Sequence, residues 1–323
     1  RFLFGLVDSE DLPLNVSRET LQDDTVIRRI RGSLVKAVFD RLERLAKEEP
    51  DAFQTFTDQF GALLKEGAIV DVLQRERLAK LVRFESSQKA DGRRDVSLDD
   101  YVSRMPEGQK RIYFLGGPDL AAIEKNPNLE VFRKRKLEVL YLTEPVDEFV
   151  MNALGSFSGK PLTSIDSDDL DLPDAPAEEE PEKLDESKAE PGFQRVLTLF
   201  REAIGDRVRE VRESHRLTDS PCCLVNADGS FSTQMQRILK MANQEVPEAS
   251  RILEVNPKAP LVRRLSRLSA NAEHDGFIKE CGLQLWSNAL MLEGVTPDAR
   301  ELVGRIQGFM DEAAEKRSPL IVP

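Results

Sequence analysis

The sequence predicts a multidomain protein of mixed α+β and α/β class. A helical bundle comes first, a small α/β sandwich second, and an α+β domain that ends in helices last. Three observations predict this order: a helical apolar stripe within residues 24–48, two short apolar strands within 111–143, and an acidic segment over 166–192 that separates two bodies. At 323 residues, the chain is long enough for two or three domains with a core each.

The helical bundle is predicted from apolar residues that recur every three or four positions. Residues 24–48 carry one such stripe, made of Val26, Ile30, Leu34, Val38, Leu42 and Leu45. A second helix follows Pro50 with Phe53, Phe56, Phe60, Leu63 and Leu64, and a third runs from Leu73 to Leu81. A core position explains the phenylalanines of this bundle better than a ligand pocket does.

The sandwich is predicted from a strand, a helix and a second strand. Residues 111–115 form the first strand, an Ala-rich helix follows Gly116-Gly117-Pro118, and residues 137–143 form the second strand with its own turn and helix. This order implies parallel pairing. A Gly-Gly turn after a strand can hold phosphate, but the GxGxxG and Walker spacings are lacking, so a plain βα turn is favoured.

Residues 166–192 break every periodicity. Residues 166–190 hold twelve acidic residues against Lys183 and Lys188, a charge of −10, so the other 298 residues carry −2 of the total −12. Four prolines lie in the same stretch: Pro173, Pro176, Pro181 and Pro191. Such a composition cannot bury enough apolar surface to offset its ordering entropy, which predicts a flexible linker.

The second body is predicted to be α+β. Its expected elements, in order, are a helix over 193–204, an edge strand over 208–217, a strand over 222–225, a helix capped by Ser230 or Ser232 that runs to Ala242, a strand over 252–255, and helices near 261–268, 277–292 and 298–313.

Composition excludes several classes of protein. The body outside the acidic segment is nearly neutral, so a nucleic-acid binder with a basic face is not expected. No apolar run is long enough to cross a membrane. Cys222, Cys223 and Cys281 lack metal-ligand spacing and have only His215 and His274 to help, so reduced, partly buried thiols are expected rather than a zinc site.

Five runs, in order, resemble one known family. They are Leu12–Gln22, Asp99–Met105, Ile112–Phe114, Val139–Phe149 and His215–Pro221. The sequence resembles heat-shock protein 90 chaperones, most closely of the bacterial HtpG type, over nearly the whole chain. The resemblance implies that residues 1–165 are the C-terminal part of the middle domain, 166–192 the linker, and 193–323 the C-terminal dimerisation domain. It also implies a longer parent protein whose N-terminal ATP-binding domain is absent here, so that ATP and Mg²⁺ are cofactors of the parent and the chain itself binds none and hydrolyses no ATP.

The resemblance assigns the first run a catalytic role. In the family, an arginine of this loop reaches the γ-phosphate of ATP held by the N-terminal domain, and Arg18 stands at that place, with Gln22 in support. A guanidinium suits this role because phosphoryl transfer builds charge on the γ-phosphate oxygens. Without the resemblance, Arg18 would be interpreted as a solvated loop residue.

The resemblance also implies a surface for non-native client proteins. It falls on Glu148, Phe149 and Asn152 and on a helical stripe of Phe231, Met235, Ile238 and Leu239. Phe149 stands where many members have Trp, which keeps the aromatic body and loses the indole donor. Methionine suits contact with varied partners. Core packing is the alternative for both groups.

The last two helices are expected to pair with those of a second copy, as a four-helix bundle in a homodimer. The expected interface residues are Phe277, Cys281, Leu285, Ala299, Leu302, Val303, Ile306, Phe309, Met310 and Ala313. The final residues lack an MEEVD or KDEL ending, so a tetratricopeptide co-chaperone is not expected at the tail, and the bacterial cytoplasm is the expected location.

The leading interpretation is therefore part of an ATP-dependent chaperone that works as a homodimer on non-native clients and with other chaperones, without nucleic acid or membrane. A non-catalytic dimeric scaffold is the first alternative. A small-molecule enzyme on the 111–165 unit is the second, but residues 1–214 contain no histidine for a catalytic triad.

Overall fold

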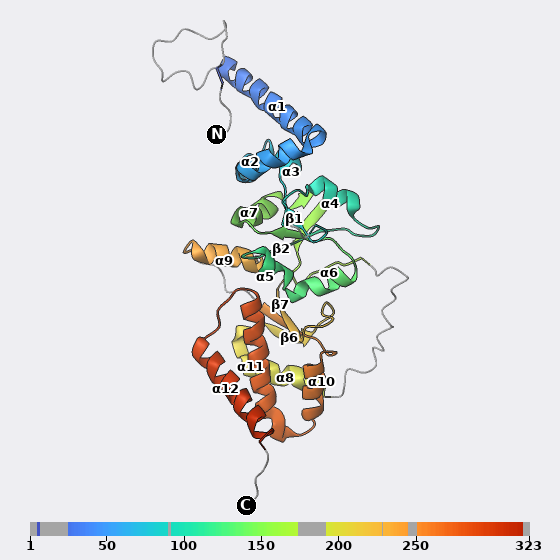
Figure 1. The fold of residues 1–323 in the computed structure, drawn as a ribbon, viewed down its shortest axis with the longest axis vertical. Coiled ribbons are helices and arrows are strands. Elements are labelled where there is room, and N and C mark those ends of the chain that lie inside the picture. The colour runs from blue at the N-terminus through green and yellow to red at the C-terminus, as the bar shows by residue number, and fades with distance from the viewer. Residues whose placement is uncertain are drawn as a thin grey trace, which may run out of the picture.

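The computed structural model describes residues 5–6, 25–89, 92–173, 192–227, 229–244 and 251–318. The molecule is elongated, with α1 (Thr25–Glu48) at one end and α12 (Ala299–Glu315) near the other (Figure 1). A sandwich around a five-stranded sheet and a second body around a three-stranded sheet lie between these two helices. The predicted mixed α/β multidomain class is confirmed.

The predicted helical bundle is present. Helix α1 is followed by α2 (Pro50–Val70) and α3 (Arg75–Leu81), and Pro50 occupies the first turn of α2, where its missing N–H leaves no bond unmade. Phe53 and Leu64 of α2 are buried, as the apolar spacing predicts. The guanidinium of Arg77 joins α3 to α1 by donating to Asp40 at 2.7 Å and to Glu43 at 2.8 Å.

The sandwich contains a five-stranded sheet in the order β1 (Glu85–Ser86), β3 (Leu140–Leu142), β2 (Ile112–Gly116), β5 (Lys160–Ser164) and β4 (Ser156–Phe157). Strand β2 runs parallel to β3, as predicted, and also to β5. Strands β1 and β4 pair antiparallel at the two edges. The sequence analysis missed β1, β4 and β5, of which the first two have only two residues each.

Helices cover both faces of this sheet. They are α4 (Leu98–Arg104), α5 (Leu120–Glu124), a 3₁₀ turn (Pro127–Leu129), α6 (Glu130–Lys134) and α7 (Pro145–Leu154). Alternate residues of the central strands belong to separate cores. Ile112 and Phe114 pack with the bundle side, whereas Tyr113 and Leu115 pack with α5 and α6. This period of two gives a sheet buried on both faces.

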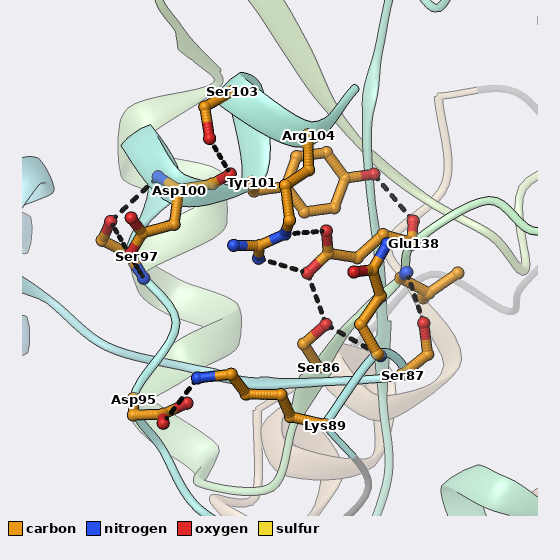
Figure 2. Close-up of polar contacts among 12 residues, drawn as sticks. Ser86, Ser87, Lys89, Asp95, Ser97, Asp100, Tyr101, Ser103, Arg104 and Glu138 are labelled. Carbon is orange, nitrogen blue, oxygen red and sulfur yellow. Dashed lines mark hydrogen bonds and ion pairs between the residues drawn. The ribbon is translucent and has the colours of Figure 1, made fainter. Parts of the chain in front are cut away.

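The run Asp99–Met105 forms a structural network around Glu138, shown in Figure 2. Arg104 donates to both oxygens of the Glu138 carboxylate, at 3.0 and 2.7 Å, and the Tyr101 hydroxyl donates to the Glu138 carbonyl at 2.8 Å. Ser86 donates to the same carboxylate from β1. Two-pronged pairing with arginine is the strong form of an ion pair, so this run holds α4 to the sheet.

The second body is built on a sheet in the order β6 (Glu210–Glu213), β8 (Arg251–Val255), β7 (Cys222–Asn226). Its helices are α8 (Phe193–Ile204), α9 (Thr233–Met241), α10 (Pro260–Leu268), α11 (Asp275–Leu292) and α12. All predicted elements are present. The edge strand β6 is shorter than the predicted 208–217, because the chain from Ser214 onward turns to contact the sandwich.

The first part of the predicted linker is folded. Asp166 is 3% exposed, and Ser167 pairs with Asn226 of the second body in a parallel bridge. Residues 166–173 therefore belong to the folded part of the chain. The remainder of the predicted linker, residues 174–191, lies outside the described residues.

Candidate functional site

The predicted catalytic loop is not placed by the structure. Arg18 and Gln22 both lie outside the described residues. The other candidate for phosphate binding in the sequence analysis, the Gly116-Gly117 turn, lies within the described residues. Glu148 Oε1 lies so close that a Cβ on Gly116 would be 2.1 Å from it. A carboxyl group in that place does not suit a phosphate, which agrees with the prediction of a plain βα turn.

Helix α7 has one buried face and one exposed face. Glu144 forms a capping box with Asp147, and Pro145 occupies the first turn, which fixes where the helix begins. Val150 and Met151 are buried in the core beside the bundle. On the other face, Phe149 is 36% exposed and Asn152 is exposed, so these two predicted contact residues do face solvent.

Glu148 does not. Its side chain is 1% exposed, and its Oε2 atom accepts a hydrogen bond from the Ser232 hydroxyl at 2.8 Å. Among the described residues, Oε1 has no hydrogen-bond partner. Burial of the carboxyl raises the pKa of Glu148 to about 8, so the group is largely neutral at pH 7. The prediction that Glu148 contacts a client directly is not met in this conformation.

Helix α9 packs against α7 and extends outward beside it (Figure 1). Ser232 is the N-cap, since its hydroxyl accepts from the Met235 amide at 3.1 Å. Phe231 is 45% exposed, whereas Met235 is 3% exposed, so of the two only Phe231 is open to a partner.

The rest of the predicted stripe is intermediate. Ile238 and Leu239 are half-buried. The structure adds Met241, 70% exposed at the end of α9, which the sequence analysis did not select although it continues the spacing from Ile238. The large apolar side chains exposed on α7, on α9 and just before the N-cap of α9 are thus Phe149, Met241 and Phe231.

Polar residues from both bodies hold the base of α9. Asp166, which follows β5, accepts from the Thr233 amide at 2.8 Å and from the Ser164 hydroxyl at 2.6 Å. Asn226 of β7 donates to the Thr233 hydroxyl at 3.0 Å. The first turn of α9 is therefore fixed to the sandwich and to the second sheet at once.

The run His215–Pro221 forms the main joint between the two bodies. Arg216 is 6% exposed and pairs with Glu254 of β8 at 3.0 Å. The same guanidinium donates to the carbonyls of Ile165 at 2.8 Å and Ser167 at 3.0 Å, at the end of the sandwich.

Glu130 of α6 completes the joint from the opposite side. Its carboxylate accepts from the backbone amides of Thr218 at 2.7 Å, Asp219 at 2.9 Å and Ser220 at 3.1 Å. Burial alone would raise the pKa of Glu130, but these hydrogen bonds hold it below its ordinary value. The Glu130 carboxylate of the sandwich thus satisfies three backbone amides in a turn of the second body.

The predicted dimer face separates into buried and exposed parts. Cys281 and Leu285 of α11 are buried in the core of the second body and are not available to a partner here. Phe277 and Phe309 pack edge to face, with ring centroids 5.9 Å apart, and join α11 to α12.

The remaining expected interface residues lie on α12. No residue within the described α12 is buried. Val303, Ile306 and Met310 are 60%, 40% and 65% exposed and follow one another at helical spacing, whereas Ala299 and Ala313 are exposed and Leu302 is half-buried. Part of the predicted face therefore holds α12 to its own body, and part is open.

Other chemistry is not apparent in the described part of the chain. All three cysteines are free and buried, and burial raises the pKa of Cys222 to about 12 and that of Cys281 to about 11, so these thiols are unreactive. Across the described ranges no group of His, Cys, Asp or Glu could hold a metal ion. Nor does any helix there have the length and apolar character that a bilayer crossing needs.

Comparison with known proteins identifies the family. The family model described as "Hsp90 protein" matches residues 1–319. The chain is 43% identical over 297 residues to the chaperone protein HtpG of Geobacter metallireducens, which covers 91% of this chain and 45% of the relative. It is 44% identical over 311 residues to HtpG of Polaromonas naphthalenivorans, with 96% and 48% covered. The chain spans about half the length of these relatives, and it belongs to the Hsp90 protein family.

Proposed function

We propose that this chain forms the end of the middle domain and the C-terminal domain of an ATP-dependent, HtpG-type chaperone of the bacterial cytoplasm. In this proposal, a homodimer binds and remodels non-native proteins. The observation that best supports the proposal is that α7 packs against α9 and that Phe149, Phe231 and Met241 are exposed on and beside these two helices. Exposed apolar side chains of this kind serve to bind partners that expose apolar groups of their own.

The proposed contact surface can be tested by removing two of these side chains. Phe149→Ser combined with Phe231→Ser should weaken capture of a permanently unfolded protein, such as reduced carboxymethylated α-lactalbumin, about tenfold, or about 1.4 kcal/mol. Both side chains are substantially exposed, so the melting temperature should stay within a few degrees. Fluorescence anisotropy of the labelled probe measures the affinity.

Leu34→Ser provides the matched control, because Leu34 of α1 is 48% exposed, and α1 extends from the end of the molecule away from α7 and α9 (Figure 1). It should leave capture unchanged. Equal loss of capture in the control and in the double variant would show that the effect is not specific to α7 and α9, and the proposed surface would be abandoned.

The ATP-dependent part of the proposal rests on family membership and on the loop Leu12–Gln22. We propose that Arg18 contacts the γ-phosphate of ATP bound by another domain of the parent protein, with Gln22 in support. Arg18→Ala should then slow ATP turnover by the full-length protein at least tenfold, about 1.4 kcal/mol of barrier, while ATP binding changes little. Arg28→Ala on the exposed start of α1 is the control. Unchanged turnover with Arg18→Ala would assign Arg18 a structural role or none.

A further inference from the structure

Glu148 occupies an unusual place in the proposed contact surface. Its neighbours in sequence, Phe149 and Asn152, face solvent, but its own carboxyl group is buried between α7, the end of β2 and the start of α9. A client on the outer face of α7 cannot reach that group while α9 keeps this position. Any effect of Glu148 on client binding must therefore pass through another residue.

Ser232 provides the connection. Its hydroxyl accepts from the Met235 amide at 3.1 Å and donates to Glu148 Oε2 at 2.8 Å, so one oxygen caps α9 and ties it to α7. Capping fixes the direction in which a helix leaves its first turn. The hydrogen bond to Glu148 therefore sets the direction of α9 relative to α7, and with it the position of Phe231 next to the cap.

Gly116 provides the room for this link. An added Cβ would lie 2.1 Å from Glu148 Oε1 and 2.9 Å from Cβ of Gln234, and real atoms do not approach so closely. The glycine at the end of β2 thus leaves the space in which the carboxyl group of α7 and the first turn of α9 meet in this arrangement. The neutral state indicated by the raised pKa of Glu148 agrees with a carboxyl group that is buried without a cation.

We infer that Glu148 is a positioning residue, which acts through Ser232 to hold α9 against α7 so that the apolar side chains of both helices face one client segment together. This inference rests on the proposed function, because it assigns Glu148 a role at the same surface. It replaces direct contact between Glu148 and the client.

Positioning and direct contact differ in how two substitutions combine. If Glu148 acts through Ser232, Glu148→Ala and Ser232→Gly break one link, and the double variant should be no worse than either single variant. If Glu148 touches the client itself, the two losses should add, because they remove separate interactions. Glycine is chosen at Ser232 because it is well tolerated at N-caps, so that the loss of the hydroxyl is not confounded by a weakened helix.

The experiment measures the affinity of the full-length protein for reduced carboxymethylated α-lactalbumin. We expect Glu148→Ala, Ser232→Gly and the double variant each to weaken binding about tenfold. Glu148→Gln and Ser232→Thr should bind like the unmodified protein, since each keeps the hydrogen-bonding group with nearly the same reach. Gly116→Ala should reproduce the loss from the opposite side of the carboxyl group.

A distance measurement gives a second, independent result. Spin labels on cysteines introduced at the exposed positions Asn152 and Lys240 report the separation of α7 and α9, while the three native cysteines are buried. The distance distribution should be narrow in the unmodified protein and with Glu148→Gln, and should broaden with Glu148→Ala or Ser232→Gly.

Additive losses with an unchanged α7–α9 distance would overturn the inference in favour of direct contact. Full affinity in both Glu148→Ala and Ser232→Gly would also overturn it. If Glu148→Ala does not fold, the comparison of Ser232→Gly with Ser232→Thr decides alone. The double variant Phe149→Ser with Phe231→Ser separates failure of the proposed surface from failure of the positioning role. Normal client binding by this variant would refute the proposed surface. Weak binding by this variant together with normal binding by Glu148→Ala would refute only the positioning role.

Discussion

Replacing Arg216 with methionine is expected to lower the free energy of unfolding by about 3 kcal/mol, since breaking a buried ion pair by removing one partner leaves an uncompensated charge. The charge left behind is that of Glu254, which is 4% exposed. The carbonyls of Ile165 and Ser167 would lose their donors in the same step. Arg212, which donates to Glu254 at 2.8 Å, should limit the loss.

Urea denaturation followed by circular dichroism measures this effect. Arg212→Met is the matched control: its side chain is 32% exposed, so its pair with Glu254 should contribute less than about 1 kcal/mol. Adding Glu254→Gln to Arg216→Met should recover part of the lost stability, because a buried carboxylate that has lost one of its two arginine partners is then removed. A loss below 1 kcal/mol with Arg216→Met would show that the joint between the two bodies does not depend on this arginine.

The second large effect is expected at α12. Val303, Ile306 and Met310 form an exposed apolar stripe on a helix that contacts its own body through Phe309 and Arg305. Pairing of this stripe with the same stripe of a second copy would bury an isologous interface of at least about 1,200 Å². Ile306→Glu with Met310→Glu should then yield folded monomers, with dimer affinity lowered about a thousandfold or more, because buried unpaired charge is costly.

Both substitutions introduce the same charge so that the new side chains cannot pair across the two-fold axis. Sedimentation velocity at micromolar concentration measures the oligomeric state, and circular dichroism confirms that the variant folds. Leu34→Glu, which places a charge on an exposed apolar position of α1, should leave the dimer intact. A monomeric unmodified protein would remove α12 from any dimer interface.

Periodicity in the sequence is sufficient to predict most of this fold. The 3–4 spacing over residues 24–48 predicted α1 almost to the residue, and the strand–helix–strand order around Gly116 predicted the parallel pairing of β2 with β3. These elements have long or regular apolar patterns. Strand β4 has two residues and pairs only at an edge, so it is too short to show such a pattern in the sequence.

The candidate site was harder to predict, for a physical reason. Helix α9 lies at the junction of two bodies and is partly covered on more than one side, so its apolar spacing could not separate the buried Met235 from the exposed Phe231. Glu148 was expected at the surface because the family resemblance placed it in the client-binding segment with Phe149 and Asn152. The space at Gly116 and the hydroxyl of Ser232 accommodate the buried carboxyl group, and both are contributed by segments distant in sequence.

The resemblance of a run to a family likewise does not reveal its structural role. The segment His215–Pro221 carried part of the resemblance, and its first three residues were interpreted as the end of an edge strand over 208–217. In the structure, Arg216 and the amides of Thr218, Asp219 and Ser220 bind groups of the sandwich. Long-range pairing of this kind depends on the tertiary fold, and one sequence does not contain that information locally.

We propose that α7 and α9 form the surface that binds non-native proteins. Site-specific photo-crosslinking tests it most directly, with a benzophenone amino acid placed at Phe149, at Phe231 and, as a control, at Leu34, all three exposed. We predict that the unfolded α-lactalbumin probe crosslinks at Phe149 and Phe231 and not at Leu34. Crosslinking at Leu34 as strong as at the other two positions, or none at Phe149 and Phe231, would contradict the claim.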